Sequence, residues 1–294
     1  MRVFVTGASG WIGSAVVPEL LGAGHTVVGL ARSDASAGKL EAAGAEVLRG
    51  TLDDLDVLRR GAEAADGVVH LAFIHDFSDY QRSVGTDLRA VETLGAALEG
   101  SGRPFVNTAG LAGMSFGRPA TERDTIVADS PRAASERTAL AVAERGVRSS
   151  VVRLAPSVHG EGDSGFIAAL AGIARTKGVS GYIGDGANRW PAVHRLDAAR
   201  LFRLALEQAP AGSVLHGAGD EGIPIREIAE VIGRKLDLPV VSIPAEQAAE
   251  HFGWLGAFLA ADIPASSALT QELLGWQPSG PGLLADLESG YYTR

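Results

Sequence analysis

The sequence predicts an α/β protein built on a doubly wound parallel sheet. Short apolar runs alternate along the 294 residues with longer segments in which apolar residues recur every three or four positions. The longer segments indicate helices that pack on one face, and the apolar runs are typical of strands that are covered on both faces. An alternation of such strands and helices favours a parallel sheet with helices on both sides.

The expected elements follow one another in a regular order. The runs predicted as strands are 2–5, 26–30, 45–48, 67–71, 104–107, 150–154 and 213–216. The segments predicted as helices are 12–22, 54–64, 83–99, 132–145 and 197–209. Beyond Leu154 the alternation becomes less regular, and short helix-like and strand-like pieces are interrupted by prolines. We therefore expect a core of residues 1–160, rejoined by about 188–216, and a smaller lobe of residues 161–187 and 217–294.

Composition excludes several classes of function. Lysine and arginine number 26 against 35 acidic residues, a formal net charge of −9 without a basic run, so nucleic acid and anionic membranes are not expected partners. The absence of cysteine excludes disulfides, thiolate metal sites and cysteine nucleophiles, and no His, Asp or Glu group has metal-ligand spacing. No apolar run approaches the ~18 residues of a membrane span, and no signal peptide is recognised at residues 1–30. We expect a soluble, cytoplasmic protein that acts on a small molecule.

A glycine-rich turn follows the first predicted strand and opens the first helix. Gly7, Gly10 and Gly13 stand three residues apart. This spacing lets the backbone turn tightly, approach a pyrophosphate without an intervening Cβ, and pack the helix against the strand. The backbone N–H groups at the helix start then face the anion. An ordinary tight turn is the alternative, but the place of this turn in an alternating chain favours dinucleotide binding.

The end of the second strand favours NADP over NAD, although NAD remains possible. A site selective for NAD usually carries an acid here, whereas an arginine accommodates the 2′-phosphate of NADP. Arg32 and Ser33 occupy the position, and the first acid is Asp34. The alternative is that Arg32 is only a solvated surface residue.

Two further strand ends carry residues that suit a cofactor. Asp53 follows Leu52 and is suited to accept the adenine amino group, although Asp53 or Asp54 is equally suited to cap the following helix. His70 ends the fourth strand and is expected to be a hydrogen-bonded core histidine rather than a catalyst.

These motifs, taken in order, resemble the extended short-chain dehydrogenase/reductases of the NAD(P)-dependent epimerase/dehydratase family. The matching segments are 6–13, 52–53, 70–72, 152–160, 192–197 and 274–278. The resemblance implies a Rossmann core with a substrate-binding C-terminal lobe, and a stretch beside the nicotinamide at 156–158. The predicted cofactor-binding residues are Gly7, Ser9, Gly10, Trp11, Ile12, Gly13, Arg32, Ser33, Leu52, Asp53, Leu71, Ala72, Pro156, Ser157 and Val158.

The resemblance also implies a two-fold homodimer formed by the helices around 84–99 and 132–145. Ala134, Thr138 and Ala141 are small residues on one face of the second helix, which favours close approach of two copies.

The chain departs from this family at its catalytic pair. Family members carry a tyrosine and, four residues later, a lysine, with a serine or threonine upstream; Thr108 fits the upstream position, but Arg132 and Glu136 stand where tyrosine and lysine belong. A guanidinium does not release its proton near neutral pH, so Arg132 is predicted to steady an oxyanion or hold a substrate carboxylate. Glu136 is predicted to accept hydrogen bonds from the ribose hydroxyls. The alternative is that Arg132 and Glu136 form only a surface ion pair.

The proton must then come from another group. The candidate donors, which follow strands, are His75, Asp76, Tyr80 and His159, although an ordinary surface residue is the commoner outcome for each. His194 is expected to serve structure at the lobe junction. The predicted substrate contacts are His75, Ser115, His159 and Trp190. The candidate pocket walls are Phe73, Phe77, Met114, Phe116, Trp190 and Trp254, a set that favours a largely apolar substrate but is also ordinary core material.

Three functions are compatible with these residues. The favoured one is an NADP-dependent oxidoreductase that moves a hydride to or from a carbonyl, imine or activated double bond. A nucleotide-sugar epimerase or dehydratase is suggested by the resemblance and by Arg189, but such chemistry depends on the missing tyrosine. The third is a non-catalytic NADP sensor or scaffold, which loss of the catalytic pair would allow.

Overall fold

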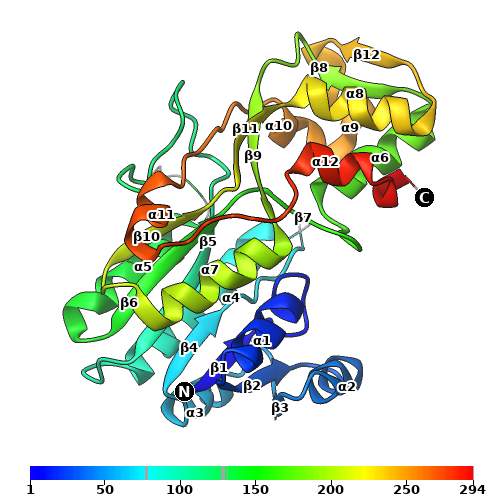
Figure 1. Ribbon diagram of the computed structural model, residues 1–294. Coiled ribbons are helices and arrows are strands. Elements are labelled where there is room, and N and C mark those ends of the chain that lie inside the picture. The colour runs from blue at the N-terminus through cyan, green and yellow to red at the C-terminus, as the bar shows by residue number, and fades with distance from the viewer. Residues whose placement is uncertain (77–78, 127–129, 131, 294) are drawn as a thin grey trace.

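The predicted parallel sheet is present and forms the centre of the molecule. The computed structural model describes residues 1–76, 79–126, 130 and 132–293. Seven parallel strands lie in the order β10-β6-β5-β4-β1-β2-β3, so the chain moves outward in both directions from β1 (Figure 1). The strands are β1 (Arg2–Thr6), β2 (Thr26–Ala31), β3 (Glu46–Arg49), β4 (Gly67–His70), β5 (Pro104–Gly110), β6 (Arg148–Leu154) and β10 (Ser213–Gly217).

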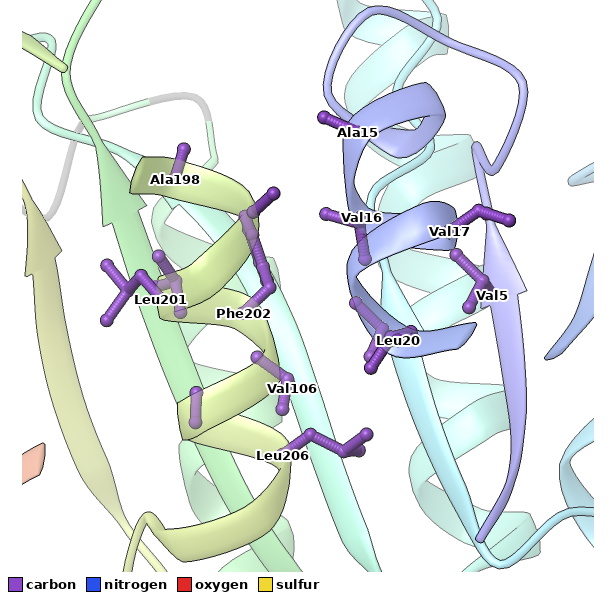
Figure 2. Close-up of a cluster of buried hydrophobic side chains, with 14 of the residues drawn as sticks. Val5, Ala15, Val16, Val17, Leu20, Val106, Ala198, Leu201, Phe202 and Leu206 are labelled. Carbon is purple, nitrogen blue, oxygen red and sulfur yellow. The ribbon is translucent and has the colours of Figure 1, made fainter. Parts of the chain in front are cut away.

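Helices cover both faces of this sheet, which confirms the doubly wound Rossmann architecture. They are α1 (Gly13–Gly22), α2 (Asp34–Ala42), α3 (Leu55–Glu63), α4 (Tyr80–Ala97), α5 (Ala133–Ala141) with a 3-10 turn (Val142–Arg145), and α7 (Arg195–Gln208). Helices α1, α2 and α7 supply one buried apolar cluster, and α3, α4 and α5 supply another. Figure 2 shows the first cluster, in which Leu20 of α1 and Phe202 of α7 lie over Val5 and Val106 of the sheet.

Each strand predicted for the sheet is found, with small differences in its ends. Helix α2 was not predicted, because it buries only Ala37 and Leu40 and therefore shows no regular apolar face. Its start is marked instead by a cap, in which the Ser33 hydroxyl accepts a hydrogen bond of 3.2 Å from the backbone N–H of Ser36.

A second group of elements lies beyond the edge at which the sheet strands end (Figure 1). Its strands form two small sheets, β11-β9-β7 and β12-β8. The strands are β7 (Ser157–His159), β8 (Ser180–Ile183), β9 (Arg189–His194), β11 (Asp220–Pro224) and β12 (Val240–Ile243). The helices are α6 (Phe166–Lys177), α8 (Ile225–Leu236), α9 (Ala248–Phe252), α10 (Gly256–Leu259) and α12 (Leu283–Glu288), with 3-10 turns at Ala245–Gln247, Gly253–Leu255 and Tyr291–Thr293. Helix α11 (Ala268–Leu274) instead packs beside β10 and α7 of the main sheet (Figure 1).

Most of this group packs around an apolar core of its own, which includes Ile167, Leu170, Ile228 and Leu287. The division into a cofactor domain and a substrate-binding lobe at the predicted boundaries stays a prediction. No helix in the described ranges is both long and apolar enough to cross a membrane.

Candidate functional site

The glycine turn after β1 is packed so tightly that side chains are excluded from two of its three glycines. Gly7 has a φ of +68°, and a Cβ there would lie 2.7 Å from the backbone nitrogen of Ala72. A Cβ on Gly13 would lie 2.1 Å from the carbonyl oxygen of Gly7. Gly10, in contrast, is exposed, and a Cβ there would approach only the Gly7 oxygen, at 3.2 Å. Gly7 and Gly13 therefore shape the turn, and Gly10 keeps the outer surface of the turn free of side-chain atoms.

The turn also presents backbone donors that nothing occupies. Helix α1 begins at Gly13 without a side-chain cap. The N–H groups of Trp11 and Ile12 find no acceptor among the residues that the structure describes. Unsatisfied donors at the positive end of a helix dipole form an anion site. The turn fits the pyrophosphate of a dinucleotide on this structural ground.

Trp11 connects this turn to the stretch that the resemblance places beside the nicotinamide. Its indole Nε1 donates a hydrogen bond of 2.7 Å to the carbonyl oxygen of Val158, and the Arg195 guanidinium lies 4.2 Å from the ring centroid. Ser157 is buried, and Pro156 and Val158 are half-buried. The predicted stretch 156–158 therefore lies next to the glycine turn.

The end of β2 carries an exposed guanidinium. Arg32 is exposed and has no ion pair in the described part of the chain. Asp34, the nearest acid in sequence, is paired with Arg49 at the end of β3. The Ser33 hydroxyl is occupied as the cap of α2 and also donates to the hydroxyl of Ser36. Arg32 is thus the group at this position that is available to an anionic ligand.

The two acids after β3 have different partners. The Asp54 carboxylate accepts hydrogen bonds from the backbone N–H and hydroxyl of Thr51 at 2.8 and 2.9 Å, and these bonds lower the pKa of Asp54. The Asp53 carboxylate, which is half exposed, lies 3.3 Å from donors of Thr86 and Arg89 on α4. Asp54 therefore closes the turn before α3 without capping that helix through its side chain, and Asp53 faces α4. The neighbouring Leu52 is buried, and Leu71 and Ala72 are half-buried.

Thr108 and Arg132, two of the three predicted catalytic residues, are in contact. The Thr108 hydroxyl donates a hydrogen bond of 2.7 Å to the carbonyl oxygen of His70, so it is not directed at a substrate oxygen as a donor. The Arg132 guanidinium donates to the carbonyl oxygen of Thr108 at 2.8 Å and lies 4.2 Å from the centroid of the Phe73 ring. The Arg132 side chain is one-fifth exposed, so it is fixed in place while part of it remains accessible.

The prediction for Glu136 is wrong. Both of its carboxylate oxygens accept hydrogen bonds from Arg153, at 2.5 to 3.2 Å, and both side chains are only 2% exposed. The predicted alternative, an ion pair between Arg132 and Glu136, is also wrong, because Arg132 pairs with Asp87. Helix α5 packs on β6, and this packing turns residue 136 toward the sheet rather than toward the ribose.

A buried row of polar side chains lies behind Arg132. His70 Nδ1 is 2.7 Å from the Thr6 hydroxyl, and His70 Nε2 is 3.3 Å from Asp87 Oδ1, which confirms His70 as a hydrogen-bonded core residue. The Arg132 guanidinium lies 3.4 Å from the same Asp87 oxygen. Burial raises the pKa of Asp87, but the hydrogen bond from His70 and the charge of Arg132 outweigh it and hold that pKa below its usual value. Asp87 is therefore a buried carboxylate.

Residues near Phe73 include two of the candidate proton donors. The His75 ring lies 5.2 Å from the Phe73 ring, and the Tyr80 ring lies 6.0 Å from it. Burial and the charge of Arg132 lower the pKa of His75, which reduces its protonated fraction at neutral pH. Burial raises the pKa of Tyr80, which keeps the phenol protonated.

Two predicted substrate contacts are buried and bonded to other residues of the protein. His159 is fully buried, and its Nδ1 donates to Asp286 at 2.5 Å, because the C-terminal helix α12 packs over β7. Trp190 is 1% exposed, and its indole donates to the carbonyl oxygen of Ala261 at 3.1 Å inside the second core. The His194 ring lies 5.6 Å from the His159 ring, measured between centroids. His194 also accepts a hydrogen bond from the backbone at the start of α7. Its predicted structural role is in accord with this contact.

The remaining pocket residues divide by exposure. Ser115 is exposed on the segment after β5, Phe116 is 37% exposed, and Met114 is buried. Trp254 is 51% exposed and packs with Phe166. Phe77 lies outside the described residues.

The sequence reasoning missed Asp87 and the aromatic group around Phe166. Asp87 lies on the buried face of α4 with Ala90, Val91 and Leu94, and an acid on an apolar helical face was the signal that could have revealed it. Phe166 contacts the rings of Trp190, Trp254 and Phe258 at 5.6 to 6.0 Å, a group assembled from distant segments that no local pattern marks. No cluster of metal-ligating side chains occurs among the residues described.

The comparisons with known proteins agree with this geometry. Residues 3–216 match the model of the NAD dependent epimerase/dehydratase family, and the chain belongs to that family. It therefore has the NAD-binding oxidoreductase fold of a family of NAD-dependent enzymes.

Individual relatives cover nearly the whole chain. An uncharacterized protein of Schizosaccharomyces pombe is 52% identical over 99% of this chain and 100% of its own length. The 2′-dehydrokanamycin reductase of Streptomyces kanamyceticus is 31% identical over 85% of this chain and 72% of its own. The fold is also similar to that in a crystal structure of the dTDP-glucose 4,6-dehydratase DesIV from Streptomyces venezuelae with NAD bound. The TM-score is 0.78 and the sequence identity 22%, and the match covers 99% of this chain and 96% of that one.

Proposed function

We propose that the protein is an NADP-dependent oxidoreductase that transfers a hydride between NADPH and a carbonyl, imine or activated double bond of a small, largely apolar molecule. The observation that carries this proposal is that the Arg132 guanidinium is held at the same edge of the sheet as the glycine turn. Only β4 separates β5, which bears Thr108, from β1, which leads into the turn. Arg132 binds the Thr108 carbonyl, and Thr108 in turn binds His70, the strand neighbour of Thr6.

The chain's own residues supply binding and electrostatic stabilisation. The bound nicotinamide would supply or accept the hydride. Gly10, Trp11 and Ile12 would hold the pyrophosphate, and the accessible part of the Arg132 guanidinium would donate a hydrogen bond to the substrate oxygen as negative charge develops there. Arg132 does not give up a proton, so the proton would come from water or from a neighbouring phenol or imidazole, such as Tyr80 or His75.

Arg32 supports the choice of NADP. It is an exposed guanidinium at the end of β2 with no competing ion pair in the described ranges. A planar guanidinium binds a phosphate through two parallel hydrogen bonds. Arg49 pairs with Asp34 and so partly offsets the negative charge of the nearest acid, which would otherwise repel a 2′-phosphate.

Aromatic side chains support a largely apolar substrate. Phe73 covers one face of Arg132, and Phe116, Trp254 and Phe258 are exposed by 37, 51 and 39%. Arg189, which suggested a sugar nucleotide, is bound to Asp262 at 2.9 Å and offers no comparable support for an epimerase.

A homodimer through α4 and α5 is part of the same proposal, and a monomeric mass by light scattering at micromolar concentration would contradict it.

The test is to measure NADPH binding and NADPH oxidation with the purified protein. Calorimetry gives the dissociation constants for NADPH and NADH, and a panel of ketones, aldehydes, imines and enones gives turnover. NADPH binding together with turnover of any substrate class supports the proposal. NADPH binding without turnover of any compound favours a cofactor sensor, and absence of binding to either cofactor overturns the assignment.

A further inference from the structure

We propose that Asp87 is a positioning residue, which holds the Arg132 guanidinium in the orientation that the substrate oxygen requires. This inference rests on the proposed function, because Arg132 is the group assigned there to the substrate. Asp87 itself is 1% exposed and lies behind Arg132, so it acts through Arg132 and not on the substrate directly.

Asp87 joins three elements of the core. It lies on α4, it is 3.3 Å from His70 Nε2 at the end of β4, and it is 3.4 Å from Arg132 at the start of α5. Both contacts use the oxygen Oδ1. A carboxylate withdrawn this far from water is tolerated only when its charge is paired.

The hydrogen-bond partners of His70 indicate which ring nitrogen faces Asp87. The Thr6 hydroxyl oxygen accepts from the backbone N–H of Ala72 at 3.3 Å, and its own hydrogen is therefore free to point at His70 Nδ1. With Nδ1 accepting, the ring proton lies on Nε2 and is donated to Asp87. The full positive charge beside Asp87 is that of the Arg132 guanidinium, 3.4 Å from the same carboxylate oxygen.

Three contacts hold the Arg132 guanidinium in its orientation. The Thr108 carbonyl binds one nitrogen at 2.8 Å, the Phe73 ring covers one face at 4.2 Å, and Asp87 supplies the negative charge. Of the three contacts, that with Asp87 joins opposite charges, and this attraction is stronger in a buried site than in water. Loss of this charge would free the guanidinium to turn, and a displacement of about 1 Å in a reacting group costs on the order of 10²-fold in rate.

The experiment is a double-mutant cycle between Asp87 and Arg132. We expect Asp87→Asn, which keeps the shape of the side chain, to lower kcat at least tenfold while the KM for substrate and the Kd for NADPH change less than about threefold. In the Arg132→Ala background, Asp87→Asn should have no further effect on kcat. An equal loss of kcat in both backgrounds would show that Asp87 acts on the fold alone. Asp56→Asn, which removes one charge of an exposed Asp–Arg pair on α3, is the matched control and should leave kcat unchanged.

A spectroscopic measurement tests the same contact without turnover. We expect the ¹⁵N–¹H spectrum of the unmodified protein to show a sharp Arg132 Nε–H signal and slow rotation about the Nε–Cζ bond, assigned by its loss in Arg132→Lys. Asp87→Asn should broaden this signal. A freely rotating guanidinium in the unmodified protein overturns the inference even if Asp87→Asn does not fold. A fixed guanidinium in a protein that reduces no substrate would instead overturn the proposed function and leave the contact between Asp87 and Arg132 established.

Discussion

Glu136 and Arg153 form an ion pair that is almost completely withdrawn from solvent, with both side chains 2% exposed. Arg153 lies on β6 and Glu136 on α5, and the pair joins the helix to the sheet. The Arg153 guanidinium also donates to the carbonyl oxygen of Asp124 at 2.8 Å, so the same cation holds the segment that follows β5. The residue that was predicted to bind the ribose is thus part of the framework.

We expect Glu136→Ala to destabilise the protein rather than to weaken cofactor binding. Removing one partner of a buried ion pair leaves an uncompensated charge and lowers the free energy of unfolding by roughly 3–5 kcal/mol. The matched control is Glu99→Ala, which breaks an exposed Glu–Arg pair and should cost less than ~1 kcal/mol. Urea denaturation measures both. A variant at position 136 as stable as the control, with weakened NADPH binding, would restore the ribose assignment.

The glycines of the turn should separate into two classes. A Cβ at Gly10 meets only one oxygen, at 3.2 Å, so Gly10→Ala should change the free energy of unfolding by less than ~1 kcal/mol but raise the Kd for NADPH at least tenfold. Gly7→Ala should cost roughly 2 kcal/mol or more in stability, since it combines positive φ with a clash against Ala72. Gly100→Ala has a similar φ of +70° and open space around it, so it measures the contribution of φ alone. Unaltered NADPH binding by Gly10→Ala would exclude the turn as the pyrophosphate site.

Arg32 should determine the choice between the two cofactors. We expect the unmodified protein to bind NADPH at least tenfold more tightly than NADH, a difference of about 1.4 kcal/mol. Arg32→Ala should remove most of this preference and leave the Kd for NADH nearly unchanged, whereas Arg59→Ala, which alters another exposed arginine, should preserve it. Calorimetric titration gives all the constants. Equal affinities in the unmodified protein would contradict the NADP assignment.

Arg132→Ala should impair turnover and spare the cofactor. Loss of one hydrogen-bond donor to a developing oxyanion lowers kcat/KM by about 10²-fold or more, while the Kd for NADPH should barely move. The control is Arg137→Ala, which removes an exposed arginine from the same helix. Steady-state kinetics with the best substrate of the panel decides the matter. Equal kcat/KM values in the two variants would remove Arg132 from the site.

His159 should make stability fall in mild acid. Burial lowers the pKa of His159 despite the opposing effect of Asp286, so the unfolded chain takes up the proton first as the pH falls below about 6.5. The free energy of unfolding should therefore decrease from pH 7.5 to pH 5.5, by at most ~1.4 kcal/mol per pH unit for this group. His159→Gln should be less stable at pH 7.5, because Asp286 loses its donor, yet its stability should depend less on pH. Parallel curves for the two proteins would show that His159 does not contribute.

The sequence was most informative where structure depends on neighbours along the chain. The strands of the main sheet were predictable because both faces are buried, and the glycine turn was predictable because its constraints are local. Helix α2 was missed since it buries little, and its start is recognisable only by the Ser33 cap. The small sheets of the C-terminal group were not predictable, because their strands pair across long insertions.

The errors at the candidate site have a common physical cause. Register alone assigned Glu136 to the ribose, but its partner Arg153 lies on another element. His159 was expected to face a substrate, and its partner Asp286 lies 127 positions along the chain. Partners of this kind are determined by packing and leave no periodic signal, so a polar residue's type indicated its chemistry but not the direction in which it points.

Trp11 holds the glycine turn in place, which neither the glycines nor the helix dipole do. Its hydrogen bond to Val158 and its contact with Arg195 tie the turn to β7 and α7 without any ligand. A turn that is already rigid loses little conformational entropy when an anion binds, so a larger share of the interaction energy is expressed as affinity. Such preorganisation also means that the protein without ligand and its complex should differ little in backbone shape at this turn.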